Sequence, residues 1–250
     1  MAEQVPIADI VTLRDSGVWG KDAETDGISV LRSTNFGEDG EISFENLALK
    51  SVDKRDSERK RLIPGDILVE KSGGGPKQPV GRVCFFRGDS QPHLFGNFIA
   101  RLRVDPTRCE SRFLFWFLHI GHQNGATENL QKQTTGIRNL EFNRFLDQPI
   151  FLPSLDEQRR LAELLDRAVE IRRRAEASHA KACGVIPALF VDTFGDPATN
   201  PKGWPVIKLG DAISFGLRTD SIGQQQITVA GFEFFGSTVL TTEPSAIKLH

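Results

Sequence analysis

The sequence predicts an α+β fold, with a sheet-rich domain over residues 1–152 and a long amphipathic helix over residues 153–190. Two observations predict this order. Short apolar runs separated by glycine and proline fill the first part of the chain. After Pro149, apolar residues instead recur at intervals of three and four, which is the period of a helix. Residues 191–250 are interpreted as a linker and the incomplete start of a second domain.

Four apolar runs are the clearest strand candidates, because they are rich in Val, Ile, Leu or Phe. They are Ile28–Arg32, Asp66–Glu70, Gly81–Phe86 and Phe98–Val104. Turn residues such as Pro64-Gly65 and Gly73-Gly74-Gly75-Pro76 separate them. Residues 108–120 are instead dense in Phe, Leu and Trp, which predicts a mostly buried helix.

The long helix is expected to begin at a capping box formed by Ser154 and Glu157. In a capping box, the side chain of each residue accepts the free backbone N–H of the other. Charged residues fill most positions between the apolar ones, so the helix carries an apolar stripe. The stripe either packs within this chain or binds a helix of another chain or repeat. Pro187 is expected to kink the helix, and Gly195-Asp196-Pro197 to end it. The stripe residues predicted to contact a partner helix are Leu161, Leu164, Leu165, Ala168, Ile171 and Ala175.

Two segments of similar pattern suggest that the chain begins a second copy of its first domain. Residues 5–10 read Val-Pro-Ile-Ala-Asp-Ile, and residues 205–213 read Pro-Val-Ile-Lys-Leu-Gly-Asp-Ala-Ile. After Leu217 only short strand-like or turn-like pieces follow, at residues 221–226 and 232–235. We therefore expect an incomplete domain at this end.

Composition excludes several classes of protein. The net charge of -2 and the mean hydropathy of -0.27 are those of an ordinary soluble chain. No apolar run approaches the roughly 20 residues that span a bilayer, and the first residues lack the pattern of a secretory signal, so a cytoplasmic location and no membrane partner are expected. Cys84, Cys109 and Cys183 lie far apart, which predicts small apolar side chains rather than a metal site.

The sequence offers little for catalysis, since it contains no phosphate-binding loop, nucleophile elbow or metalloprotease motif. His119 and His122 are interpreted as a pair at a surface or helix end rather than as metal ligands. Asp66, Glu70 and Lys71 resemble the acidic pair and lysine of magnesium nucleases. Glu70 and Lys71 are neighbours in a strand, however, and so point to opposite faces. A magnesium-dependent nuclease is kept only as the alternative function, and cleavage of DNA by the isolated protein would identify it.

Two polar segments favour binding to DNA. Residues 71–88 carry four cations and no carboxylate, and their glycines let a phosphate approach the backbone. Residues 131–139 combine amides, hydroxyls, a glycine and cations, which suit base edges and phosphates. The residues predicted to contact DNA are Lys71, Ser72, Gly73, Lys77 and Arg82 in the first segment, Gln133, Thr134, Thr135, Gly136, Arg138 and Asn139 in the second, and Arg32 and Asn35 after an early strand.

The order of several motifs resembles the DNA-specificity subunit of type I restriction-modification systems. These are residues 31–36, Leu-Arg-Ser-Thr-Asn-Phe; residues 62–73, Leu-Ile-Pro-Gly-Asp-Ile-Leu-Val-Glu-Lys-Ser-Gly; residues 79–83, Pro-Val-Gly-Arg-Val; residues 133–140, Gln-Thr-Thr-Gly-Ile-Arg-Asn-Leu; and residues 152–158, Leu-Pro-Ser-Leu-Asp-Glu-Gln. Residues 194–205 also look like the join to the second half of such a subunit. Each motif is weak alone, and it is their order that is specific.

The resemblance implies a target-recognition domain that grips half of a split site in double-stranded DNA, followed by a spacer helix. It implies a full subunit of two such units whose helices pair antiparallel, with no catalytic residue, metal or cofactor of its own. DNA methyltransferase (modification) subunits would use S-adenosylmethionine, and a restriction/translocase subunit would use ATP and magnesium.

Only one complete unit is present in this sequence, which leaves two interpretations. The chain is a half-subunit that forms a homodimer through its long helix, or it is a truncated remnant of a full-length specificity subunit. A specificity domain fused to catalytic domains would carry the same motifs. The start at Met1 favours a separate subunit over such a fusion.

Overall fold

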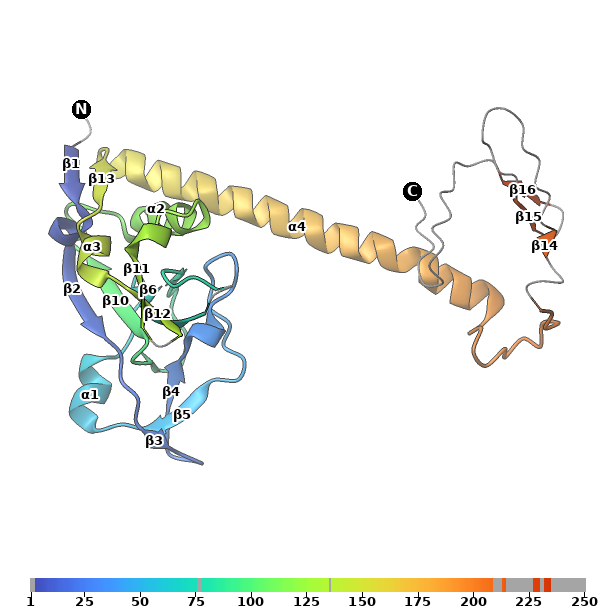
Figure 1. Cartoon of the computed structure of the whole chain (residues 1–250), viewed down its shortest axis with the longest axis horizontal. Coiled ribbons are helices and arrows are strands. Elements are labelled where there is room, and N and C mark those ends of the chain that lie inside the picture. Colours follow the sequence, from blue (N-terminus) through green and yellow to red (C-terminus); the bar gives the residue numbers. More distant parts are fainter. Residues whose placement is uncertain are drawn as a thin grey trace. The chain divides into compact units, whose positions relative to one another are not determined.

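The computed structural model describes residues 3–75, 78–134 and 136–208, together with short strands at 213–214, 227–229 and 232–234. The chain divides into two compact units, Met1–Ala177 and Ser178–His250. In the first unit, sheets and short helices precede the long helix α4 (Leu155–Phe194), as Figure 1 shows. The predicted α+β fold is therefore confirmed.

The central sheet of the first unit has the strand order β2-β10-β6-β8, and all neighbouring strands are antiparallel. Its strands are β2 (Val11–Ser16), β6 (Ile67–Glu70), β8 (Val83–Phe85) and β10 (Ile99–Val104). Three of these strands confirm predicted apolar runs. Strand β6 is buried along its whole length, because it lies inside the sheet with a neighbour on each side.

A second sheet has the order β3-β5-β4-β9, in which β4 and β9 are parallel. Its strands are β3 (Lys21–Asp22), β4 (Ile28–Leu31), β5 (Ala48–Ser51) and β9 (His93–Phe95), and β4 confirms the fourth predicted run. Strand β1 (Glu3–Pro6) pairs with β13 (Pro149–Leu152), with Val5 opposite Ile150. This pairing joins the two ends of the sheet-rich domain just before α4 begins.

A third sheet of the first unit has the order β11-β12-β7 and is formed by β7 (Ser72–Gly74), β11 (Gln131–Thr134) and β12 (Ile137–Leu140). In the second unit, β14 (Ile213–Ser214), β15 (Ile227–Val229) and β16 (Phe232–Phe234) form a separate sheet. Strand β16 coincides with one of the predicted pieces of the tail. The other piece, residues 221–226, and residues 209–212 of the repeated pattern lie outside the described residues.

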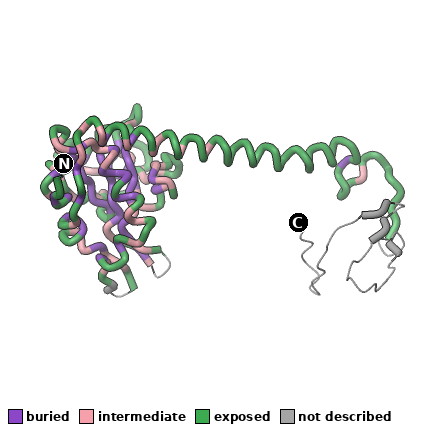
Figure 2. Tube along the Cα trace, turned by 90° about the horizontal axis from the view of Figure 1, so that it is seen from above, coloured by how far each residue is buried: buried purple, intermediate pink, exposed green. Residues whose placement is uncertain are grey.

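Helix α2 (Ser111–Gln123) carries the predicted aromatic stretch and packs it into the main core. It begins three residues later than expected, because the Glu110 side chain accepts the Phe113 N–H at 2.8 Å and caps the helix there. The shorter helices are α1 (Lys54–Arg59), α3 (Phe142–Leu146) and the 3₁₀ turns η1 (Ile7–Ile10), η2 (Ser33–Asn35) and η3 (Glu128–Leu130). Most of the buried trace in Figure 2 lies within this domain.

The histidine pair lies near the end of α2 and is less exposed than the sequence predicted. His119 is buried, and its ring stacks on Phe115 with centroids 5.3 Å apart. His122 Nδ1 lies 2.7 Å from the Thr127 hydroxyl oxygen. Among the described residues no group of three His, Cys, Asp or Glu side chains could hold a metal ion.

We expect the free energy of unfolding to fall as the pH is lowered from about 7.5 to 5.5. Burial lowers the pKa of both His119 and His122. The pKa is lowered further by Arg112 and Arg172 near His119 and by Arg82 near His122. The folded state therefore favours neutral imidazoles, whereas histidines of the unfolded chain take up protons near pH 6.5. The stability that the neutral rings give is present above that pH and is lost as the pH falls.

Urea unfolding at several pH values in this range tests the expectation. The double variant His119→Gln/His122→Gln should lose less stability than the natural chain over the same range. An identical loss in both proteins would show that other groups cause it.

Helix α4 is anchored to the domain by its first turns. Ser154 Oγ accepts the Glu157 N–H at 3.4 Å, but the Glu157 carboxylate pairs with Arg160, so only half of the predicted capping box forms. Gln158 is buried, and its amide accepts the Glu110 N–H at 2.8 Å. Asp166 accepts hydrogen bonds from α2, at 2.8 Å from Arg112 Nε and 2.9 Å from Trp116 Nε1.

The helix continues past Pro187 and spans Leu155–Phe194, which corrects the expected boundaries of 153–190. A proline lacks one N–H and so removes a single intrahelical hydrogen bond, which does not stop this helix. The helix ends at Phe194, directly before Gly195-Asp196-Pro197, as the sequence predicted. No helix among the described residues is long and apolar enough to cross a bilayer.

The six predicted stripe residues divide into two groups on α4. Leu161 and Leu165 are half-buried, and Leu165 packs against the domain core. The others, Leu164, Ala168, Ile171 and Ala175, are exposed. Figure 2 shows that most residues along α4 are exposed. The helix therefore uses one side to hold the domain and leaves a second apolar side uncovered within its own unit.

The cysteines match the sequence interpretation at two of three positions. Cys84 and Cys109 are buried, and burial raises the pKa of both thiols, that of Cys109 to about 12. Cys183 is exposed on α4 instead, because that turn of the helix is uncovered.

Candidate nucleic-acid interface

The two polar segments predicted to contact DNA lie in one sheet. Strand β7 pairs with β12, so that Ser72 lies opposite Asn139 and Gly74 opposite Arg138. The Ser72 hydroxyl donates to Asn139 Oδ1 at 2.5 Å. Segments more than sixty residues apart in sequence therefore form one polar surface, because the chain between them returns through the core helix α2.

Lys71 lies at the entrance to this sheet. Its backbone N–H donates to the Phe98 carbonyl at 2.9 Å, and its carbonyl accepts the Leu140 N–H at 2.8 Å. Its ammonium donates to Ser16 Oγ at 2.7 Å. Burial and the nearby Lys60 ammonium lower the pKa of Lys71. An ammonium has three donors, so this bond leaves capacity for a phosphate oxygen.

The remaining residues of the two segments are described to different extents. Gly73 and Gly136 are exposed, and Gly136 forms the turn between β11 and β12. Arg138 and Asn139 are half-buried on β12. The backbone of Gln133 and Thr134 belongs to β11, while Lys77 and Thr135 lie outside the described residues.

Arg82 is held by a buried carboxylate. Its Nε lies 2.8 Å from Glu70 Oε2 and its Nη2 lies 3.1 Å from Glu70 Oε1, and Glu70 is only 3% exposed. Glu70 and the donated hydrogen bond raise the pKa of Arg82 against the opposing effect of its burial. The guanidinium also donates to the Ser33 carbonyl at 3.0 Å. Its charge is neutralised within the domain, so we assign Arg82 to positioning of the loops and not to direct contact with phosphate.

Asn35 has a structural role, and its contact with DNA stays a prediction. It is 3% exposed, its Oδ1 accepts the Arg32 N–H at 2.9 Å, and its amide donates to the Glu45 carbonyl at 3.0 Å. These bonds hold η2 against the loop that follows it. Arg32 is half-buried, and its Nη2 donates to the Asn46 carbonyl at 2.6 Å.

The nuclease-like residues are not brought together. Asp66 is buried and binds Arg103, with Oδ1 2.7 Å from Nε, while Glu70 binds Arg82. Lys71 bonds Ser16 on another strand. Each carboxylate thus serves a separate ion pair, and this geometry does not support the nuclease alternative.

A family model covers most of the chain. The model described as "Type I restriction modification DNA specificity domain" matches residues 3–177. The chain belongs to this family. The match includes the whole sheet-rich domain and the first part of α4, which together form the first compact unit. None of the curated protein sequences matches the chain.

One solved structure of a type I system shares the fold of this specificity domain. A chain from a structure on complex assembly and conformational transition of the type I R-M system matches with a TM-score of 0.55 at 18% identity, over 75% of this chain and 43% of that one. The HsdS subunit from Thermoanaerobacter tengcongensis matches at 0.45 and 18%, over 71% of this chain and 39% of that one.

The S subunit of a type I restriction-modification system from M. genitalium matches at 0.46 and 15%, over 86% of this chain and 54% of that one. The chain thus corresponds to about half or less of each of these three proteins.

The specificity domain also has a hollow that the sequence analysis missed. It is about 340 Å³ in volume and lies where the β2–β3 connection, the end of β4 and the β9–β10 turn meet. Trp19 and Phe98 border it and are 47% and 48% exposed. Nothing in the periodicity of the sequence distinguishes these two rings from core aromatics. The available signal was their position, each within a few residues of a glycine in a connecting segment.

Proposed function

We propose that this chain supplies sequence-specific binding of double-stranded DNA to a type I restriction-modification complex. The observation that carries the proposal is the sheet formed by β7, β12 and β11, in which Lys71, Ser72, Arg138 and Asn139 come together. Amides and hydroxyls beside cations are the side chains that read base edges while holding phosphates. A DNA-specificity protein works where the genome is, so we place it in the cytoplasm.

We propose that the chain is non-catalytic and binds no cofactor. Modification would come from DNA methyltransferase subunits that use S-adenosylmethionine, and cleavage from a restriction/translocase subunit that uses ATP and magnesium. In support, the buried carboxylates Asp66 and Glu70 are each committed to an arginine and so are poorly suited to hold a metal ion.

We further propose that two copies pair through α4, so that a homodimer reads a symmetric split site. Leu164, Ala168, Ile171 and Ala175 support this, because they are exposed and follow the alternating four- and three-residue spacing of a coiled-coil seam. Each copy would present the same recognition surface, and a two-fold dimer of this kind favours a palindromic arrangement of half-sites.

The DNA contacts are tested by salt dependence. Lys71→Ala and Arg138→Ala are each expected to weaken binding and to reduce the slope of log affinity against log salt by about 1, because each lost phosphate contact releases one fewer counterion. Fluorescence anisotropy of a labelled duplex at several salt concentrations measures both quantities. Arg159→Ala on exposed α4 is the control cation, and its slope should match that of the natural chain. An unchanged slope in the first two variants would reject their role at phosphates.

A further inference from the structure

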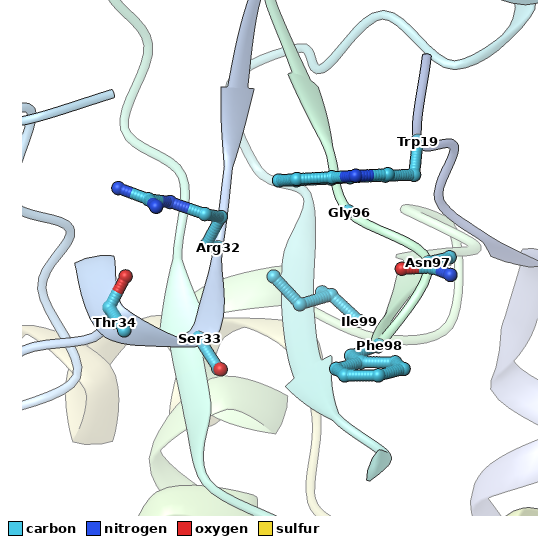
Figure 3. A pocket seen from close by; sticks show the side chains of 8 residues that line it. All are labelled: Trp19, Arg32, Ser33, Thr34, Gly96, Asn97, Phe98 and Ile99. Atoms are coloured by element: carbon cyan, nitrogen blue, oxygen red, sulfur yellow. The ribbon is translucent and has the colours of Figure 1, made fainter. Parts of the chain in front are cut away.

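The hollow beside the interface is bordered by two aromatic rings that are each about half exposed. Figure 3 shows Trp19 and Phe98 nearly edge-on, on either side of Ile99 in that view. Large exposed aromatics that gather at one concave place indicate a binding surface, because a ring left in water loses the stabilisation of burial. The lining residues are Trp19, Arg32, Ser33, Thr34, Gly96, Asn97, Phe98 and Ile99.

The Trp19 ring is held in place before any ligand arrives. The Gly17 N–H donates to the Ile99 carbonyl at 3.1 Å and the Val18 N–H to the Phe95 carbonyl at 2.8 Å. A Cβ on Gly17 would lie 2.0 Å from the Phe95 carbonyl oxygen, so only glycine allows this close approach. Lys50 Nζ lies 3.9 Å from the centroid of the Trp19 ring. This cation on its ring adds a further restraint on the indole.

Phe98 is joined to the interface loop itself. Its carbonyl accepts the N–H groups of Lys71 and Ser72, at 2.9 and 3.3 Å. Its ring lies over Gly73, where an added Cβ would be 3.1 Å from Phe98 Cδ2. The hollow and the predicted DNA-contacting loop are therefore parts of one continuous surface.

The polar groups of the hollow select the kind of ligand. Arg32, Ser33, Thr34 and Asn97 provide hydrogen-bonding groups, and no carboxylate is present among the described residues that line it. The Lys71 ammonium adds a positive charge near the hollow, because it donates to Ser16, the residue before Gly17. An apolar planar group with hydrogen-bonding edges, attached to a negative backbone, matches these features. A nucleotide of a DNA strand is such a group.

We propose that this hollow binds one nucleobase that has left the helical stack. The base stacks on the exposed Trp19 and Phe98 rings, and its edge faces the polar groups of Arg32, Ser33, Thr34 and Asn97. Aromatic stacking accepts any base, because every base has a π face. Extrusion from a duplex costs least where the base is already unpaired. The proposal deepens and rests on the proposed DNA-binding function.

The test compares two duplexes of equal length and sequence, one fully paired and one with a single bulged thymine. Binding to the full-length chain is measured by fluorescence anisotropy. We expect the bulged duplex to bind about fivefold tighter or more, which is the low end of one aromatic stacking contact. Trp19→Ala should remove this preference and leave binding of the paired duplex unchanged, and Phe98→Ala should also remove the preference.

Matched variants separate stacking from folding. Trp19→Phe and Phe98→Tyr keep a ring and should retain most of the preference, whereas Trp19→Leu and Phe98→Leu fill space without a π face and should lose it. Phe151→Ala removes a ring that is 61% exposed on β13 and should change nothing.

Three outcomes would overturn the proposal. Equal binding of both duplexes by the natural chain rejects the base site and leaves the proposed function intact. An equal loss on both duplexes in Trp19→Ala and Trp19→Leu would show that the ring contacts paired DNA. Absence of binding to either duplex rejects the proposed function, and the base site with it.

Discussion

Replacing Asp15 with alanine is expected to lower the free energy of unfolding by about 3–5 kcal/mol, because it removes the nearest counter-charge of two buried cations. The Asp15 carboxylate accepts from Arg101 at 2.9 and 3.0 Å and from the Lys60 ammonium at 2.8 Å. The side chains of Arg101 and Lys60 are 1% and 7% exposed. After the replacement Arg101 would keep only the more distant Asp66 carboxylate, at 3.8 Å, and Lys60 would keep its bond to the Ser16 carbonyl.

Urea unfolding followed by circular dichroism measures the effect. Glu163→Ala is the control, since its pair with Arg167 on α4 is exposed at both ends and is worth about 0.5 kcal/mol or less. Adding Lys60→Met to Asp15→Ala should restore part of the stability, because it removes one of the unpaired cations. If Asp15→Ala were no more harmful than Glu163→Ala, the network would have no role in holding the domain together.

The same network shows where sequence reasoning stops. Lys60 belongs to a basic run, residues 54–61, that is interleaved with acidic residues and reads as a solvated helix face. It is buried because β2 places Asp15 beside it, forty-five residues away in sequence. Likewise, Arg82 and Asn35 are residue types that often contact DNA. Only the fold shows that their side chains are hydrogen-bonded to Glu70 and to the Glu45 carbonyl.

Element type was predictable because it depends on local pattern. The four apolar runs became β4, β6, β8 and β10, and the long helix that was expected from residue 153 begins at Leu155. Strand order was not predictable. Strand β10 lies between β2 and β6, and β4 pairs in parallel with β9, and both arrangements depend on contacts between distant segments.

The interface was predictable in composition and not in arrangement. The residues of 71–73 and 133–139 stand out by their cations and amides, but the pairing of β7 with β12 that joins them comes from the fold. Trp19 and Phe98 gave no signal in the periodicity of the sequence, because an exposed aromatic and a core aromatic have the same pattern until the chain around them is placed. The backbone next to Trp19 is fixed by the close contact at Gly17, and the Phe98 ring lies over Gly73.

The double variant Leu164→Asp/Ile171→Asp is expected to weaken self-association of the chain by more than about 100-fold, because two carboxylates per helix would be buried in the seam. Leu164 and Ile171 are 55% and 68% exposed, so the domain does not need them for its own core. In the second unit, Val185 and Leu189 of α4 are also exposed and continue the same spacing. The variant should therefore unfold at nearly the same urea concentration as the natural chain.

Light scattering on a size-exclusion column gives the mass of the chain, alone and co-expressed with a methyltransferase subunit. The natural chain should contribute two copies to each complex, and the variant one. Ala177→Asp/Ala180→Asp adds the same charge at exposed α4 positions away from the seam, and it should leave the dimer intact. A variant that stays dimeric would place the contact elsewhere. A natural chain that is monomeric and binds neither methyltransferase nor DNA would instead favour a remnant of a longer specificity subunit, because an exposed apolar stripe persists in a chain that has lost its second helix.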